Sequence, residues 1–340
     1  MNIFGDCPSE DKGGGVKSCY IGVHDGTESE QSSDSGGRVG GRDPGIQPRT
    51  KGAVTEIALI DSNRDKAEAE VLDIKQGASL GRSVNIEATG YDACRDSAIA
   101  IITAGARQRP GESRVDLMER NVAIMKSIVA SVKDTGFRGI LLVISNPVDV
   151  LTWVAFAESG FPASRVIGSG TTLDSARLRE YVARHCRINP QNIHGYVLGE
   201  HGDTSFTAWS LLTSGGIHFD EFCPVCGSCG ESSDFKRNAA EDVRITAYKI
   251  IEAKGSTCYA IGQAASLIVE AIVRDERRIL PVSTARKDFN GIARTAFGFP
   301  TIVGREGVVQ VLDFKLAPEE EALLHASARF VGDNISHAGY

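Results

Sequence analysis

The pattern of apolar and polar positions changes character near residue 53. Downstream of it, short apolar runs alternate with stretches that carry apolar residues at helical spacing. We expect strands over residues 54–60, 98–103 and 140–144, and helices over 64–76 and 115–132. Strands separated by helices form βαβ units and a parallel sheet. The sequence therefore predicts an α/β fold built on a doubly wound parallel, Rossmann-like sheet.

The second half of the chain has a different pattern, in which helices and strands are mixed. Helix-like stretches cover residues 174–185, 235–254, 259–274 and 319–334, and strand-like segments lie near Tyr196 and over 279–282 and 308–314. The 340 residues suit two domains. We expect one domain over residues 51–168 and a mixed α+β domain over 169–340.

Residues 1–50 differ in kind from the rest. Glycine and serine pairs lie among scattered charges, and no apolar periodicity lasts long enough for a helix. A strand is suggested over residues 19–23. We expect an atypical, irregular segment here.

Composition narrows the class of protein. Hydrophobic residues make up 41% of the chain and charged residues 24%, which is typical of a globular protein. The net charge of −7 disfavours a nucleic-acid partner, which needs a basic face. No stretch is long and apolar enough to cross a bilayer, and the first residues lack the basic start and apolar run of a secretory signal. We therefore expect no membrane association, a cytoplasmic location and free thiols at the eight cysteines.

Polar residues directly follow the predicted strands of the first domain. In an open parallel sheet, ligands bind beyond the carboxyl ends of the strands. Asp61, Thr103 and Asn146 occupy such positions and are the first candidate site residues.

A stronger signal is the motif Gly199-Glu200-His201-Gly202-Asp203, in which glycines leave the histidine exposed at a turn. Histidine titrates near neutral pH and can exchange a proton with an alcohol or ketone oxygen. The alternative is a turn histidine without a chemical role, which is the commoner case for a histidine taken alone.

Two further motifs carry charge. Asp174 and Arg177 are three residues apart and share a helix face. The carboxylate can orient a histidine and the guanidinium can hold a substrate carboxylate through two hydrogen bonds, although a surface ion pair is the alternative. Residues 105–114 follow a strand and contain glycine, proline and arginine. They indicate either a mobile loop whose arginine polarises a carbonyl or a charged surface loop.

These three motifs together resemble those of the lactate/malate dehydrogenase family, and specifically its bacterial L-lactate branch. The resemblance extends over residues 52–340 and is close over 52–77, 103–121, 145–149 and 168–203. It implies an oxidoreductase that reduces pyruvate to L-lactate with NADH. The cofactor, NAD, is needed because no side chain delivers a hydride. On the same basis we expect a homotetramer.

The resemblance also assigns roles to individual residues. His201 would be the general acid and base, Asp174 would pair with it and raise its proton affinity, and Arg114 would polarise the ketone. The positions that match substrate contacts are Gln108, Arg114, Asn146, Arg177 and Thr257. The positions that match cofactor contacts are Asp61, Lys66, Tyr91, Gly105, Ala106, Ser127, Ser145, Asn146 and Ser169. Asp61 suits an NAD ribose because a carboxylate accepts from the 2′-hydroxyl and repels a 2′-phosphate.

Gln108 separates two branches of the family. Malate dehydrogenases carry an arginine at this position, which pairs with a second substrate carboxylate. With a neutral glutamine, a dicarboxylate would bury an unpaired charge. Pyruvate therefore fits better, although Arg109 lies next to Gln108. The alternative is a malate dehydrogenase or another 2-hydroxyacid dehydrogenase.

Two other groups of residues have a possible binding role. Arg179 and His194 match positions where bacterial members bind fructose 1,6-bisphosphate, and a basic pair attracts phosphate. The alternative is two solvated surface residues.

Cys223, Cys226 and Cys229 have the spacing of ligands to zinc or an iron–sulfur centre. A fourth ligand does not follow nearby, so we expect no metal.

The opening of the chain departs from the family pattern. A strand, a Gly-x-Gly-x-x-Gly loop and a helix should precede Gly52, because this loop brings backbone N–H groups to the cofactor pyrophosphate. Residues 36–41 are glycine-rich but follow no predicted strand, and Pro44 and Pro48 interrupt the expected helix. We expect the first strand of the sheet to be missing, and a shift of reading frame upstream of Gly52 is one hypothesis for its loss. The alternative functions are therefore a catalytically inactive family member or a sugar-phosphate-binding module that keeps the basic pair.

Overall fold

The computed structural model describes residues 54–80, 84–106, 111, 113–226, 232–254 and 257–340, together with the backbone of residues 19–24. For Arg114, Lys254 and residues 224–226 and 232–233, as for residues 19–24, the structure describes the backbone alone. Residues 107–110, which include Gln108, and the glycine-rich residues 36–41 lie outside these ranges.

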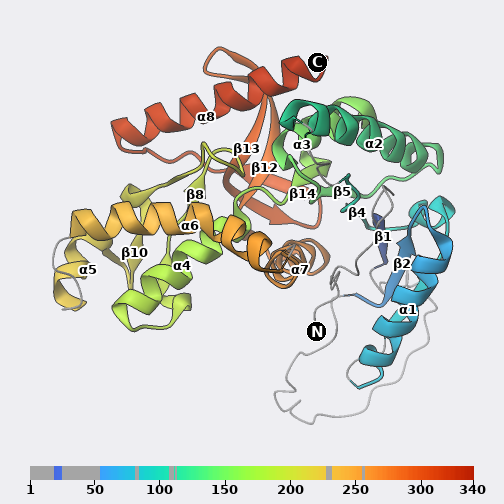
Figure 1. Cartoon of the computed structure of the whole chain (residues 1–340), viewed down its shortest axis with the longest axis horizontal. Coiled ribbons are helices and arrows are strands. Elements are labelled where there is room, and N and C mark those ends of the chain that lie inside the picture. The colour runs from blue at the N-terminus through green and yellow to red at the C-terminus, as the bar shows by residue number, and fades with distance from the viewer. Residues whose placement is uncertain are drawn as a thin grey trace, which may run out of the picture.

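Within the described ranges, a nine-stranded sheet forms the centre of the molecule (Figure 1). Its strands in spatial order are β14 (Gly307–Val311), β13 (Ile292–Gly304), β12 (Arg278–Phe289), β6 (Val166–Gly168), β5 (Ile140–Val143), β4 (Ile99–Ile102), β1 (Cys19–His24), β2 (Glu56–Ile60) and β3 (Asn85–Ala88). β4, β5 and β6 are parallel neighbours, and so are β2 and β3. β12 joins β6 in antiparallel orientation and continues into β13 and β14. The predicted Rossmann-like arrangement is thus confirmed, and the second domain extends its sheet.

Helices cover both faces of this sheet. α1 (Arg64–Ala78) and α7 (Tyr259–Val273) pack on one face. α2 (Arg114–Asp134) and α3 (Val148–Ser159) pack on the other, to which α8 (Pro318–His337) also contributes. α3 contacts α2, α8 and the β12–β13 hairpin, so burial on several sides explains its nearly continuous apolar sequence. None of the helices in the described ranges combines the length and the apolarity that a membrane span requires.

β1 lies between β4 and β2 and runs antiparallel to both. Its first residue, Cys19, pairs with Ile60 at the end of β2, and its last residue, His24, pairs with Glu56 at the start of β2. Asp61 follows the last residue of β2. The chain therefore leaves β1 at the opposite end of the strands from Asp61. The expected absence of the family's first strand stays a prediction, because residues 36–41 are not described.

The second half of the chain forms a helical layer beside the β12–β13 hairpin (Figure 1). α4 (Thr172–Cys186), α5 (Phe219–Cys226) and α6 (Ser232–Lys254) surround an apolar core that contains Leu178 and Phe219. The short strands here are β7 (Ile193–His194), β10 (Thr213–Ser214) and β11 (Ile217–His218) in one sheet, and β8 (Val197–Leu198) and β9 (Phe206–Thr207) in another. Short 3-10 helices lie at Tyr91–Cys94, Ala163–Arg165, Pro190–Asn192 and Trp209–Leu211.

The expectation of free thiols is wrong for Cys223, which is disulfide-bonded. Cys94, Cys186 and Cys258 are buried and are not disulfide-bonded. The expectation rested on an assumed reducing compartment, which the residues alone do not establish.

Candidate active site

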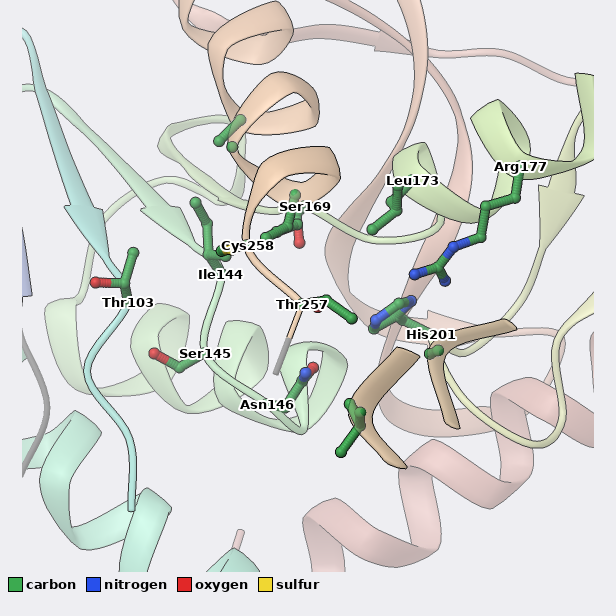
Figure 2. A pocket seen from close by; sticks show the side chains of 15 residues that line it. Thr103, Ile144, Ser145, Asn146, Ser169, Leu173, Arg177, His201, Thr257 and Cys258 are labelled. Carbon is green, nitrogen blue, oxygen red and sulfur yellow. The ribbon is translucent and has the colours of Figure 1, made fainter. Parts of the chain in front are cut away.

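A cavity of about 310 Å³ lies between the carboxyl ends of β4, β5 and β6 and the helices α4, α6 and α7 (Figure 2). The predicted site residues on its wall are Ser145, Asn146, Ser169, Arg177, His201 and Thr257, together with Thr103. Apolar residues that the sequence did not indicate complete the wall and include Leu173, Ala247, Ile251, Ile261 and Ala265. The fold thus brings strand ends of the first domain and helices of the second around one space, as is typical of a small-molecule site.

His201 lies in the turn after β8, and a glycine makes this turn possible. Gly199 has a φ of +90°, a conformation that residues with a side chain rarely adopt. Its N–H and carbonyl both pair with Gly298 of β13. A Cβ at Gly199 would lie 2.5 Å from Ser327 Oγ of α8. The glycine therefore lets the loop approach the sheet and α8 closely, and this approach fixes the position of His201.

A line of hydrogen bonds joins His201 to α4. Asp174 Oδ2 lies 2.6 Å from His201 Nδ1, and Asp174 Oδ1 accepts from Arg177 Nη1 over 2.9 Å. Asp174 and Arg177 meet because residues three apart share a helix face. Their side chains are 10% and 12% exposed, respectively. The pair is therefore largely buried rather than solvated at the surface.

Asp174 controls the protonation of His201. Its negative charge has the largest effect on the imidazole and, against the opposing effect of burial, raises the pKa of His201 to about 9. Burial by itself would raise the pKa of Asp174, but the charges and hydrogen bonds of His201 and Arg177 outweigh it and hold that pKa below its usual value. At neutral pH the ring is therefore protonated, and because Nδ1 faces Asp174, Nε2 is the nitrogen with a proton to give.

Asp149 is a residue of this site that the sequence analysis missed. It lies in the first turn of α3 and is 2% exposed. Its Oδ2 accepts from the backbone N–H of His201 over 2.7 Å, and its Oδ1 accepts from Ser283 Oγ of β12 over 2.6 Å. Burial raises the pKa of Asp149 to about 7. A signal was present in the sequence, because Asp149 interrupts an apolar helical run and a buried carboxylate needs hydrogen-bond partners.

Asn121 of α2 ties two strand-end loops together. Its Nδ2 donates to the carbonyl of Asn146 over 2.9 Å, and its Oδ1 accepts from the N–H of Ala106 over 2.7 Å. Ser145 Oγ donates to the carbonyl of Ala104 over 2.6 Å. These bonds fix the backbone around Asn146 and around the predicted cofactor position Ala106.

Asp61, at the end of β2, fits the ribose of a dinucleotide. Its side chain is 1% exposed, and its Oδ1 accepts from the N–H of Asn63 over 2.9 Å. Among the residues that the structure describes, Oδ2 has no hydrogen-bond partner, and Lys66 Nζ lies 3.9 Å from it. The charge of Lys66 at this distance compensates only part of the desolvation of a buried carboxylate oxygen that has no hydrogen-bond donor. A ligand hydroxyl would supply that donor.

Other predicted positions lie away from the cavity or outside the described residues. Gly105 follows β4, and Tyr91 is half-buried at the start of a short 3-10 helix. Ser127 is exposed on α2 and is not part of the cavity wall. Gln108 is not described, and Arg114 begins α2, where its backbone alone is described.

The two predicted effector residues lie on adjacent elements, because α4 contacts β7. Arg179 of α4 is half-buried, and this burial lowers the pKa of its guanidinium against the opposing effect of Tyr196. His194 of β7 is exposed. Their effector role stays a prediction.

A metal centre finds no support in the part of the chain that the structure describes. No three His, Cys, Asp or Glu side chains gather there in a way that could hold a metal ion. The side chain of Cys226 and the whole of Cys229 lie outside that part.

Known proteins resemble the chain over both halves. Residues 36–168 match the lactate/malate dehydrogenase NAD binding domain, and residues 171–338 match the lactate/malate dehydrogenase alpha/beta C-terminal domain. The L-lactate dehydrogenase of Thermoanaerobacterium saccharolyticum is 44% identical over 284 residues, which are 84% of this chain and 91% of that protein. The L-lactate dehydrogenase of Clostridium perfringens is 45% identical over 288 residues, which are 84% of this chain and 90% of that protein.

Solved structures show the same relationship. A lactate dehydrogenase from a deep-sea metagenome library superposes with a TM-score of 0.81 at 38% identity, covering 85% of this chain and 92% of that one. The minor L-lactate dehydrogenase of Enterococcus mundtii in its ligands-bound form gives a TM-score of 0.80 at 39% identity, covering 83% and 90%. With both domain matches and these identities, the chain belongs to the lactate/malate dehydrogenase family.

Proposed function

We propose that this chain is an NAD-dependent L-lactate dehydrogenase, which reduces pyruvate to L-lactate and catalyses the reverse reaction. The observation that carries the proposal is the hydrogen-bonded line Arg177–Asp174–His201, whose two ends, Arg177 and His201, lie on the cavity wall (Figure 2). This line puts a guanidinium beside a protonated imidazole. A 2-oxo acid presents a carboxylate next to a ketone, so its two oxygen functions match these two groups.

Arg177 holds the substrate carboxylate. A guanidinium has five N–H donors in a planar fork, and the bond to Asp174 uses Nη1. Figure 2 shows the guanidinium reaching from α4 toward the ring of His201. Further donors are thus left for a carboxylate, and charge-assisted hydrogen bonds of this kind are strong in a partly buried site. Asn146 and Thr257 line the same space and would contact the remaining substrate atoms.

His201 transfers the proton. In pyruvate reduction, Nε2 gives its proton to the ketone oxygen as negative charge develops there, and in lactate oxidation the neutral ring takes it back. Asp174 stabilises the protonated ring and keeps its orientation through Nδ1. The raised pKa of His201, about 9, keeps the acid form present at neutral pH.

NAD is the cofactor that the family match implies, and a nicotinamide supplies or accepts the hydride when it is bound. Asp61 would accept from the adenosine ribose, since its Oδ2 lacks a donor among the described residues. Ser145 and Ser169 lie on the strand-end side of the cavity and would hold the nicotinamide end. Lys66 and Ala106 are further positions for contacts along the same edge of the sheet.

The loop that leads into α2 would complete the site. Arg114 would polarise the ketone and exclude water when the loop closes. Gln108 would favour a monocarboxylate, because a neutral side chain leaves a second carboxylate unpaired. A malate dehydrogenase or other 2-hydroxyacid dehydrogenase is the alternative within the family. By resemblance to the bacterial branch, we also propose a cytoplasmic homotetramer in which Arg179 and His194 bind fructose 1,6-bisphosphate.

The orientation of β1 favours a second candidate, a family member that has lost hydride transfer. In a parallel nucleotide-binding sheet, the loop after the first strand reaches the cofactor phosphates at the carboxyl edge. β1 runs the other way, so the chain leaves it at the edge opposite to Asp61. In this case His201, Asp174 and Arg177 would lie on a scaffold that binds NADH weakly.

One titration separates these candidates. The purified chain is titrated into NADH while the fluorescence of the reduced nicotinamide is followed, and pyruvate or oxaloacetate is then added in parallel samples. Binding followed by loss of NADH with pyruvate supports L-lactate dehydrogenase. A faster reaction with oxaloacetate supports the malate alternative. Absence of NADH binding contradicts the proposal and supports the inactive member.

A further inference from the structure

We propose that Asp149 is a positioning residue for His201, which fixes the backbone of the histidine beside the cavity and adds a second carboxylate next to it. The inference rests on the proposed function, in which His201 is the proton donor. Asp149 does not line the cavity, so it acts through His201 and not on the substrate.

The geometry shows that His201 is held by carboxylates at both ends. Asp174 binds the ring through Nδ1 over 2.6 Å, and Asp149 binds the backbone N–H over 2.7 Å. The first contact orients the imidazole about its side-chain bonds. The second fixes the point from which that side chain starts. A shift of the loop would therefore disturb both contacts of His201 together.

Asp149 connects three separate parts of the fold at this point. It belongs to α3, its Oδ1 accepts from Ser283 Oγ of β12, and its Oδ2 accepts from the loop after β8. Asp149 is 2% exposed and Ser283 is fully buried. A carboxylate in the first turn of a helix often caps that helix, but both contacts of Asp149 leave α3. A buried carboxylate that costs desolvation and serves other elements indicates a role in the site.

The charges around His201 divide into opposing sets. Asp174 and Asp149 raise the pKa of its ring, whereas Arg177 and burial lower it. Glu200, in the loop of His201 itself, acts on Asp149 and raises the pKa of that carboxyl. The other neighbouring elements face the site with the hydroxyl of Ser283 of β12 and with the thiol of Cys258 before α7. Asp149 is ionised over the range in which His201 titrates, so its charge acts on that titration.

The substitution Asp149→Asn separates the charge from the hydrogen bonds. The amide oxygen can accept from the backbone N–H of His201, and the amide N–H can donate to Ser283 Oγ. The shape of the site is therefore kept while the negative charge is lost. A matched control is Thr152→Val, one turn later on α3, because Thr152 is also fully buried and its hydroxyl donates within the helix, to the carbonyl of Val148.

The experiment follows the imidazole of His201 by NMR in the full chain labelled with ¹⁵N-histidine and free of cofactor. The resonance of His201 is identified by its loss in His201→Asn. We expect Asp149→Asn to lower the pKa of His201 by about 1, as removal of a nearby opposite charge does, and Thr152→Val to leave it unchanged. An unchanged titration in Asp149→Asn overturns the proposal. If that variant does not fold, Ser283→Ala decides, because loss of the hydroxyl disfavours ionised Asp149 and must lower the pKa of His201 measurably.

Steady-state kinetics then connect this shift to the reaction. In Asp149→Asn, kcat/KM for pyruvate should begin to fall at a pH about 1 lower than in the unaltered chain, while the KM for NADH is unchanged. If the unaltered chain does not turn over, the proposed function fails, but the NMR titration still tests Asp149. If turnover is normal and the NMR titration does not move, the inference fails while the proposed function stands.

Discussion

His201 Nδ1 and Asp174 Oδ2 lie 2.6 Å apart in a largely buried contact between the loop after β8 and helix α4. The two side chains are 27 positions apart in the sequence, and the contact forms because Gly199 lets the loop reach the sheet. Each partner stabilises the charged form of the other. The ring becomes a weaker acid than a free imidazole, and the carboxylate a weaker base than a free one.

Replacing His201 by asparagine should abolish most of the turnover. Asparagine can keep a hydrogen bond to Asp174 but cannot give a proton to the ketone. We expect kcat for pyruvate reduction to fall by about 10²–10⁴-fold, with NADH affinity unchanged because the ring does not contact the ribose end of the site. Stopped-flow measurement of NADH oxidation gives the rate, and a fluorescence titration gives the affinity. Equal losses of the rate and of the NADH affinity would indicate a damaged fold instead.

Replacing Asp174 by asparagine should move the pH dependence of the reaction. Without the carboxylate, burial becomes the dominant effect on His201 and favours the neutral ring. The decline of kcat/KM for pyruvate, expected near pH 9 in the unaltered chain, should then occur below about pH 7. A profile from pH 5 to 10 checks this. A lower rate without a shifted profile would show that Asp174 orients the ring but does not set its proton affinity.

Arg177 should control substrate affinity. In Arg177→Gln the planar fork and its charge are lost, and charged hydrogen bonds to a carboxylate contribute about 1.5–3 kcal/mol. The KM for pyruvate should therefore rise by about 10–100-fold, while NADH binding is kept. Arg184→Gln is the control, because Arg184 lies on the same helix with its side chain 67% exposed. The prediction fails if both variants change the KM equally.

The stability of the chain should fall between about pH 6.5 and pH 9. The pKa of His201 is raised in the folded state, so its stabilising contribution is present in full below the pKa of the unfolded chain, about 6.5, and is lost as the pH rises through about 9. The loss is up to about 3 kcal/mol at the upper end. Urea unfolding at several pH values measures it. In His201→Asn, the free energy of unfolding should depend less on pH in this range. If the pH dependence is the same in both chains, His201 is not the group responsible.

Part of the parallel sheet could be predicted because β4 and β5 are short, fully apolar runs, whereas β3, which carries an asparagine and a glutamate, and the three-residue β6 were missed. The strands predicted over 98–103 and 140–144 correspond to β4, Ile99–Ile102, and β5, Ile140–Val143. α3 gave no amphipathic pattern, because it is buried against the sheet and two helices at once. β13 was missed because glycine and proline interrupt it. In the structure Pro300 lies opposite Pro281 of β12, and the carbonyls of both residues accept hydrogen bonds from other segments.

The candidate site could likewise be predicted only in part. His201, Asp174 and Arg177 could be predicted because glycines and a three-residue spacing mark them locally. For Asp149 the apolar run around it indicated a buried carboxylate, but its partners, His201 and Ser283, are 52 and 134 positions away and could not be identified. Contacts of this length depend on how the second domain folds over the first. A local pattern does not contain that information.

Asp61 should determine which nicotinamide cofactor the chain prefers. Its side chain is buried, and among the described residues its Oδ2 is without a hydrogen-bond partner, so a ribose 2′-hydroxyl would gain a charge-assisted bond there and a 2′-phosphate would be repelled. Asp61→Asn keeps an acceptor but loses the charge, so NADH should bind about 10-fold more weakly and the preference over NADPH should shrink. The control is Asp65→Asn, an exposed carboxylate in the first turn of α1. Fluorescence titrations with both cofactors provide the comparison.

If Asp61→Asn leaves the preference for NADH over NADPH unchanged while the unaltered chain binds NADH, the ribose lies elsewhere. If the unaltered chain binds neither cofactor, the antiparallel β1 does not provide the phosphate-binding loop. Asp61 is then a residue of a cofactor site that no longer functions.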